Sequence, residues 1–274
     1  MSGMQRTAAS SVTAATLVTA VILCPSEGRA IDHDNLDSSR PLRIEDAESI
    51  SFRERAIEFG VAPTFPYRPR RGSAGLSLSA EYLYGFALNT HLSVDFDPYL
   101  GSRSRSGDQR FDAGNVGVGV FHNLNRETLS RPAFAVRADV SLPTGRGAQG
   151  AGLRLRGIAS RTFKQYSRLH VNVDASLQTS PDDGERGFQP AVTVGVSRPF
   201  GYPTRFDRTI AAELGARASS EKDQGAVFHA GVGLRQQVTV RSVFDAGITT
   251  DFAATKGGAS RDRLRLVAGY STQF

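Results

Sequence analysis

The stretch "RDRLRLVAGYSTQF", residues 261–274, decides the fold. From Leu264 to Phe274, mostly apolar side chains occupy every second position, and polar or small residues stand between them, with Val267 as the exception. A period of two predicts a β-strand with one apolar and one polar face. The apolar face continues to Phe274, where many soluble domains have a frayed polar tail. We therefore expect the chain to end inside a sheet, in surroundings that favour an aromatic side chain.

The same alternation recurs along the chain, in runs of about ten residues that match a tilted strand crossing hydrocarbon. The clearest run is "LHVNVDASLQ", residues 169–178, and no helical pattern interrupts the series. The predicted strands cover residues 55–65, 75–84, 91–96, 114–121, 133–142, 152–157, 169–178, 190–197, 209–218, 228–236, 243–252 and 264–274.

The connections between these runs are of two alternating kinds. One kind is charged and rich in Gly and Ser, as in "RPRRGSAG" (68–75) and "GSRSRSGDQ" (101–109). The other kind is less flexible, as in "ALNT" (87–90) and "FKQYS" (163–167). Consecutive connections of an up-and-down sheet visit its two rims in turn. The alternation therefore predicts an antiparallel meander.

Two fold classes share this pattern. A secreted soluble sandwich or barrel would turn its apolar faces inward, and a membrane barrel would turn them toward lipid. Many apolar positions carry the modest side chains of Ala and Val, and the opposite parity carries Asp, Glu and Arg. We therefore predict an all-β fold: a single transmembrane antiparallel up-and-down β-barrel of about 12 strands, formed by residues 51–274. The soluble β protein is the alternative.

The N-terminal region predicts export. Residues 1–30 combine Arg6, an uncharged Ala- and Val-rich stretch and small residues before a cut after Ala30, as in a cleaved signal peptide. A lipoprotein signal at Cys24, the only cysteine, is the alternative. Residues 31–50 are polar and irregular, and we expect them to enter the barrel as a plug. We place the protein in the cell outer membrane.

The charge pattern argues against one class of partner. The net charge is +6, but the arginines are spread among acidic residues, whereas nucleic-acid binding needs a basic patch. We expect outer-membrane lipid, the barrel-insertion machinery that acts on the C-terminal strand, and an unidentified small solute as partners, and no nucleic acid.

Residues of the polar parity are candidates for the lumen wall. We expect their opposite charges to pair, because an unpaired charge shielded from water is costly, and to leave a narrow pore of low conductance and weak ion selectivity. The lumen candidates are Glu58, Glu81, Asp95, Arg137, Asp139, Arg154, Arg156, Asp174, Glu213, Arg217, Arg235, Asp245, Asp251 and Arg265. The candidates for aromatic membrane rims are Tyr82, Tyr84, Phe96, Phe244, Phe252, Tyr270 and Phe274.

No catalytic, metal or cofactor site is predicted. His91, His170 and His229 lie on the polar parity, and we find no serine opposite a histidine at equal depth on an adjacent strand. The Gly-rich stretches precede no helix, which argues against a phosphate-binding loop. The acidic run "SPDDGERG" (180–187) is interpreted as a solvated loop, with a cation site as its alternative.

Three short segments carry a family resemblance: "RPLRIEDA" (40–47), "RAIEFG" (55–60) and "VSLPTG" (140–145). They resemble outer-membrane barrels assigned to a MetA pathway of phenol degradation, a family regarded as transporters, over residues 37–274. The resemblance implies passage of small molecules, with aromatic or hydrophobic compounds as the expected solutes. A structural barrel with a closed lumen and a barrel-embedded hydrolase are the alternative functions.

Overall fold

The computed structural model describes residues 32–67, 75–101, 111–145, 150–201, 206–257 and 259–274. The predicted signal peptide, with Cys24, lies outside these ranges. Among the described residues, no helix is long and apolar enough to cross a membrane.

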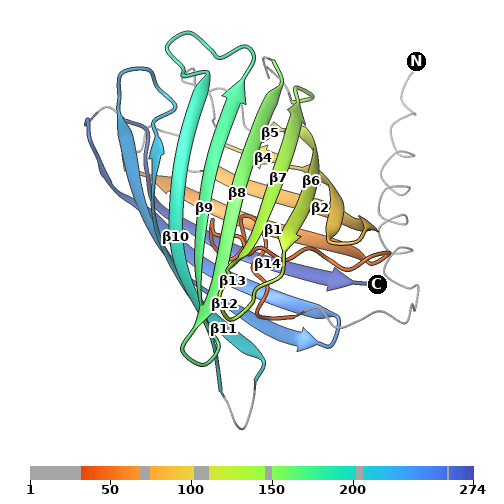
Figure 1. Ribbon diagram of the computed structural model, residues 1–274. Helices are drawn as coiled ribbons and strands as arrows, with labels where there is room; N and C mark the ends of the chain where they lie inside the picture. The colour runs from red at the N-terminus through yellow and green to blue at the C-terminus, as the bar shows by residue number, and fades with distance from the viewer. Residues whose placement is uncertain (1–31, 68–74, 102–110, 146–149, 202–205, 258) are drawn as a thin grey trace, which may run out of the picture.

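One antiparallel sheet contains all fourteen strands, and its twelve long strands close into a barrel (Figure 1). The predicted fold class, an antiparallel barrel of about 12 strands, is confirmed. The long strands are β1 (Arg55–Pro66), β2 (Gly75–Ala87), β3 (Thr90–Phe96), β6 (Val116–Asn125), β7 (Ala133–Leu142), β8 (Gly152–Phe163), β9 (Ser167–Gln178), β10 (Phe188–Phe200), β11 (Arg208–Ala218), β12 (Ala226–Thr239), β13 (Ser242–Ala254) and β14 (Asp262–Gln273).

Two further strands, β4 (Tyr99–Leu100) and β5 (Phe111–Asp112), were not predicted. The chain leaves the ladder after Phe96 and rejoins β2, where Ser77 pairs with Tyr99. Strands of two residues are too short for alternation to reveal them.

The barrel closes through β1, which pairs with β2 on one side and with β14 on the other. The β1–β14 ladder extends from Ala56↔Gln273 toward Pro66↔Asp262, and the Phe274 N–H donates to the Arg55 carbonyl at 2.9 Å. The apolar ending of the sequence is therefore half of the seam, and closure leaves none of the twelve long strands with a free edge.

The two rims of the barrel differ as the connections predict. We call the rim where β1 begins and β14 ends the terminal rim, and the opposite one the loop rim. The Gly- and Ser-rich connections, such as residues 179–187 and 219–225, lie at the loop rim. The other kind, such as residues 88–89 and 164–166, lies at the terminal rim.

The barrel wall is apolar outside and polar inside. In β9, Val173 is exposed, whereas Asn172 and Asp174 on the opposite parity are buried. Buried polar residues are numerous in the strands, and many Val, Leu, Ile, Phe and Tyr side chains of the strands are exposed. This inverted distribution is that of a barrel surrounded by hydrocarbon.

Exposed aromatic side chains form a belt near each rim. The terminal-rim belt contains Phe86, Phe134, Phe163, Phe200, Phe244 and Tyr270, and the loop-rim belt contains Phe65, Phe96, Phe188, Phe228 and Phe252. Of the remaining predicted rim aromatics, Tyr82 is exposed, and Tyr84 and Phe274 are half-buried. Such belts are typical of membrane–water interfaces.

Candidate functional site

Residues 32–50, which we call the N-terminal segment, lie inside the barrel (Figure 1, orange-red). Their backbone bonds to strand side chains rather than to a ladder. The N–H groups of Arg43 and Ile44 donate to Glu213 Oε2 at 2.8 and 3.0 Å. Glu45 exchanges two bonds with the Asn172 amide, at 2.7 and 2.9 Å. These side chains satisfy backbone groups that would otherwise be buried without partners.

Glycines on the inner wall make room for the N-terminal segment. A Cβ at Gly233 would lie 2.8 Å from Pro41 Cγ, and one at Gly195 would lie 2.5 Å from Ile44 Cδ1. Both separations are shorter than real contacts, so a side chain at either position would require the facing residue of the segment to shift. The glycines that face residues 40–44 are Gly60, Gly195, Gly231, Gly233, Gly247 and Gly269.

A buried ion cluster anchors the middle of the N-terminal segment. Glu45 accepts from Arg137 Nη1 at 3.1 Å and from Arg156 Nη1 at 2.8 Å. Arg137 also reaches Glu81 and Asp139, each at 2.8 Å, and Arg156 reaches Asp174 at 2.8 Å. Burial alone would raise the pKa of the Glu45 carboxyl, but attraction by Arg137 and Arg156 outweighs it and lowers that pKa. Glu45 is therefore ionised inside the barrel.

Further ion pairs tie other parts of the N-terminal segment to the wall. Arg40 pairs with Glu58, and Asp37 pairs with Arg235, which also bonds Asp245 at 2.8 Å. Arg168 binds Asp46 at 3.4 Å and Glu48 at 2.7 Å. Asp251 accepts from Arg43 at 3.5 Å and from Arg217 at 2.8 Å.

The start of the N-terminal segment is held at the terminal rim by His33. Its Nδ1 lies 2.9 Å from the Thr209 hydroxyl and 3.1 Å from Asp34, and its Nε2 lies 2.9 Å from the Phe206 carbonyl. Burial lowers the pKa of His33, but the hydrogen bond and charge of Asp34 outweigh burial and raise it. Asp32, His33 and Asp34 bring potential metal ligands within 4.8 Å of one another, although both ring nitrogens already have protein partners.

None of the fourteen lumen candidates has an exposed side chain in the structure. The fold brings Glu81, Arg137, Asp139, Arg156 and Asp174 into the cluster around Glu45, with Arg154 beside Asp174 at 2.8 Å. It places Glu213, Arg217, Arg235, Asp245 and Asp251 on the wall behind residues 35–44. Glu58 meets Arg40. Among the described residues, Asp95 and Arg265 have no ion pair within 4.0 Å.

One sequence expectation was wrong. Ser160 and His170 are register partners on adjacent strands β8 and β9, with Oγ and Nδ1 3.0 Å apart. The prediction ended β8 at Gly157, whereas the strand continues to Phe163, so Ser160 was not considered. His170 Nε2 also lies 2.9 Å from Ser197 Oγ, and Ser160 Oγ accepts from the Ala47 N–H at 3.1 Å. Ser160 and His170 have no solvent exposure, and Ser160 bonds the backbone of the N-terminal segment.

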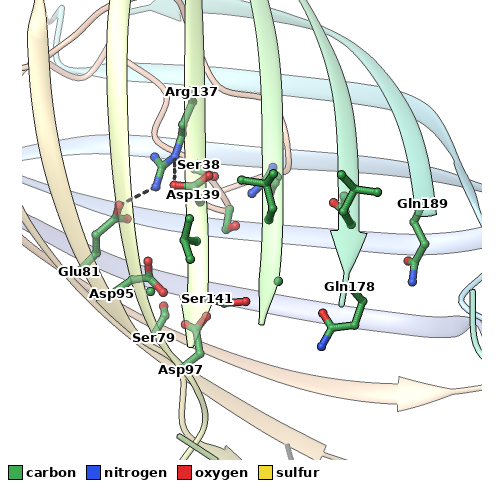
Figure 2. Close-up of a pocket in the computed structure, with 18 of the residues that line it drawn as sticks. Ser38, Ser79, Glu81, Asp95, Asp97, Arg137, Asp139, Ser141, Gln178 and Gln189 are labelled. Atoms are coloured by element: carbon green, nitrogen blue, oxygen red, sulfur yellow. Dashed lines mark hydrogen bonds and ion pairs between the residues drawn. The ribbon is translucent and has the colours of Figure 1, made fainter. Parts of the chain in front are cut away.

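Cavities remain beside the N-terminal segment. One of about 170 Å³, next to the β1–β14 seam, is lined by residues such as Arg40 and Arg265. Two others share lining residues with each other. The loop-side cavity has a volume of about 340 Å³ and is lined by residues such as Asp95, Asp139 and Gln178 (Figure 2). The terminal-side cavity has about 170 Å³ and is lined by residues such as Glu54 and His91. Both cavities are lined by Ser38, Glu58, Glu81 and Arg137. These four residues therefore separate two parts of one discontinuous path along the β1–β2–β3–β6–β7 wall.

Solved structures of outer-membrane proteins have folds similar to this one. The outer membrane channel from Pseudomonas putida F1 matches with a TM-score of 0.63 and 13% identity, over 88% of this chain and 100% of that chain. The NanC porin matches with a TM-score of 0.52 and 11% identity, over 78% of this chain and 98% of that chain. No family model and no curated protein sequence matches. The fold is therefore that of outer-membrane β-barrels.

Proposed function

We propose that this protein is an outer-membrane barrel that lets small solutes cross through a narrow lumen, restricted by its N-terminal segment. The apolar outer wall and the two aromatic belts support a membrane location. The closed seam between β1 and β14 supports a stable span, because each of the twelve long strands is paired on both sides.

The proposed orientation places the terminal rim in the periplasm and the loop rim outside. Short periplasmic turns and longer external loops are usual in outer-membrane barrels. The expected signal peptide, residues 1–30, would deliver the chain to the periplasm, where residues 31–50 would enter the lumen as the barrel closes. The C-terminal strand would be read by the barrel-insertion machinery.

The discontinuous path between the two cavities is the observation that carries the proposal. A purely structural barrel has no need of water-accessible space on both sides of the N-terminal segment. Here the residues between the cavities are Ser38 of the N-terminal segment and three charged wall residues, with the Arg137 guanidinium between Glu81 and Glu45. Side chains rotate much faster than a strand unfolds, so rotation of these wall side chains would open a route for small solutes between the two cavities.

The nature of the solute is a separate part of the proposal. The family resemblance implies aromatic or hydrophobic compounds, but the described cavity linings carry many charged side chains. The linings therefore favour small polar solutes over aromatic ones. Uptake of a labelled phenol and of a labelled amine by liposomes that contain the protein would distinguish the two classes.

A structural barrel with a closed lumen is the second candidate. The ion pairs of residues 37–48 with the wall favour it, because they oppose departure of the N-terminal segment. A hydrolase has less support, since Ser160 and His170 are covered by Ala47. We propose that the protein is not an enzyme.

Planar-bilayer recordings of the mature protein and of a variant lacking residues 31–50 test the proposal. We expect small current steps from the intact protein and larger steps after the deletion, because the segment fills part of the lumen. Resistance of the unboiled barrel to SDS is the control for folding. Large porin-like steps from the intact protein would contradict the narrow lumen. Absence of current from both proteins would favour the structural barrel.

A further inference from the structure

The two cavities differ in charge from the rest of the molecule. The whole chain has a net charge of +6. Among the described residues, the cavity linings contain ten acidic side chains and three arginines, Arg40, Arg137 and Arg154. The acidic side chains are Asp32, Asp37, Glu45, Glu48, Glu54, Glu58, Glu81, Asp95, Asp97 and Asp139.

The three arginines of the lining are already neutralised. Arg40 pairs with Glu58, and Arg154 bonds Asp174 at 2.8 Å. Arg137, which lies between the cavities, is shared among Glu45, Glu81 and Asp139 at 2.8–3.1 Å. Glu45 also pairs with Arg156, so the connected cluster contains four carboxylates (Glu45, Glu81, Asp139 and Asp174) and three arginines (Arg137, Arg154 and Arg156). The constriction therefore carries one net negative charge.

One carboxylate of the lining keeps acceptor capacity for a passing ion. Asp139 does not, since its Oδ1 accepts from Arg137 and its Oδ2, which has no hydrogen-bond partner among the described residues, is buried. Asp95 lines the loop-side cavity without an ion pair. Figure 2 shows Asp95 and Asp97 beyond the Arg137–Glu81 pair, on the side toward Ser141.

We propose that this path selects cations over anions and that its solutes are small cations, inorganic ions or amines. The inference rests on the proposed channel function and names its solute class. Acid-lined constrictions with low-dielectric walls concentrate cations and repel anions. The loop-side cavity, about 340 Å³, is at the small end of ligand-binding pockets, which limits organic solutes to small amines. The sequence predicted weak ion selectivity, because acidic and basic residues both occur on the polar parity. The structure shows which of them line the cavities, and the inference of cation selectivity replaces that prediction.

The reversal potential of single channels in a tenfold KCl gradient measures this selectivity. We expect potassium to be severalfold more permeant than chloride in the intact protein. Asp95→Asn removes a lining charge and leaves no arginine unpaired, so it is expected to lower the permeability ratio. Glu81→Gln, at the constriction, is expected to lower it further. Asp183→Asn, an exposed loop residue outside both cavities, is the matched control and is expected to keep the ratio.

Each outcome has a distinct meaning. Unselective or chloride-selective current from the intact protein would overturn the cation inference and leave the channel standing. Equal shifts for Asp95→Asn and Asp183→Asn would also overturn it, because the surface charge would then set the ratio. No current from the intact protein or from the deletion of residues 31–50 would overturn the channel itself. SDS resistance of each unboiled variant shows that its barrel is folded.

Discussion

Buried charges organise this molecule at the scale of single residues. Glu45 would be costly in the interior of a soluble domain, but here Arg137 and Arg156 approach it from β7 and β8. Arg156 and Asp174 face each other in the β8–β9 register, which alternation and strand order could predict. Glu45 could not be placed from sequence, because it lies 92 and 111 residues from its two arginines.

Glu45→Gln tests this cluster. Loss of the carboxylate leaves Arg137 and Arg156 without their shared partner, and we expect the free energy of unfolding to fall by about 3 kcal/mol, the lower end for breaking a buried pair. Guanidinium unfolding in detergent micelles measures the change. Glu48→Gln is the control, because Glu48 is 46% exposed and pairs with Arg168 near the surface. Its expected cost is below about 1 kcal/mol. Equal costs for both variants would contradict a special role for Glu45.

At the scale of elements, alternation predicted strands wherever bulky apolar residues mark the outer face. The predicted strand ended at Gly157, six residues before the end of β8, because the outward-facing Gly157 and Ala159 have little hydrophobic surface. The ladder with β9 nevertheless continues to Phe163↔Ser167, since the neighbouring strands supply hydrogen bonds whatever the side chains are. The Ser160–His170 pair was missed for this reason.

The N-terminal segment contains a titratable contact at the terminal rim. The pKa of His33 is raised, chiefly because Asp34 outweighs the effect of burial. A group with a raised pKa stabilises the folded contact fully below its unfolded value, near 6.5, and the stabilisation is lost as pH rises through the folded pKa. The groups that face the ring are Asp32, Asp34, the Thr209 hydroxyl and the Phe206 carbonyl.

We therefore expect the first residues of the N-terminal segment to loosen as pH rises. Hydrogen exchange of the amides of residues 32–35, corrected for the intrinsic pH dependence of exchange, should show less protection at pH 8 than at pH 6. His33→Ala should remove this difference and leave protection of Ile44 unchanged, because Ile44 is bonded to Glu213. Protection that is independent of pH in the unaltered protein would show that the His33 contact does not titrate as described.

At the scale of the whole molecule, the sequence predicted the barrel but not how the N-terminal segment packs inside it. The apolar C-terminal strand predicted closure, and the β1–β14 seam shows it. The glycines that receive residues 40–44 come from β1, β10, β12, β13 and β14. In the sequence these glycines cannot be distinguished from other small residues on the polar parity. Only the arrangement of the strands in the barrel shows that all of them contact residues 40–44.

The central claim is that the N-terminal segment occupies the lumen of the intact barrel. A Cβ at Gly233 would lie 3.2 Å from Leu42 Cγ, which makes these two positions suitable for a disulfide. The only native cysteine, Cys24, belongs to the expected signal peptide, so no other thiol interferes.

Cross-linking of Leu42→Cys with Gly233→Cys in outer membranes tests the claim most directly. We predict near-complete disulfide formation under mild oxidation, read as a gel shift after denaturation that reduction reverses. Leu42→Cys paired with Gly157→Cys, whose side chain would face outward from β8, should stay reduced. Failure of the first pair to cross-link in a folded, SDS-resistant barrel would contradict an N-terminal segment seated against β12.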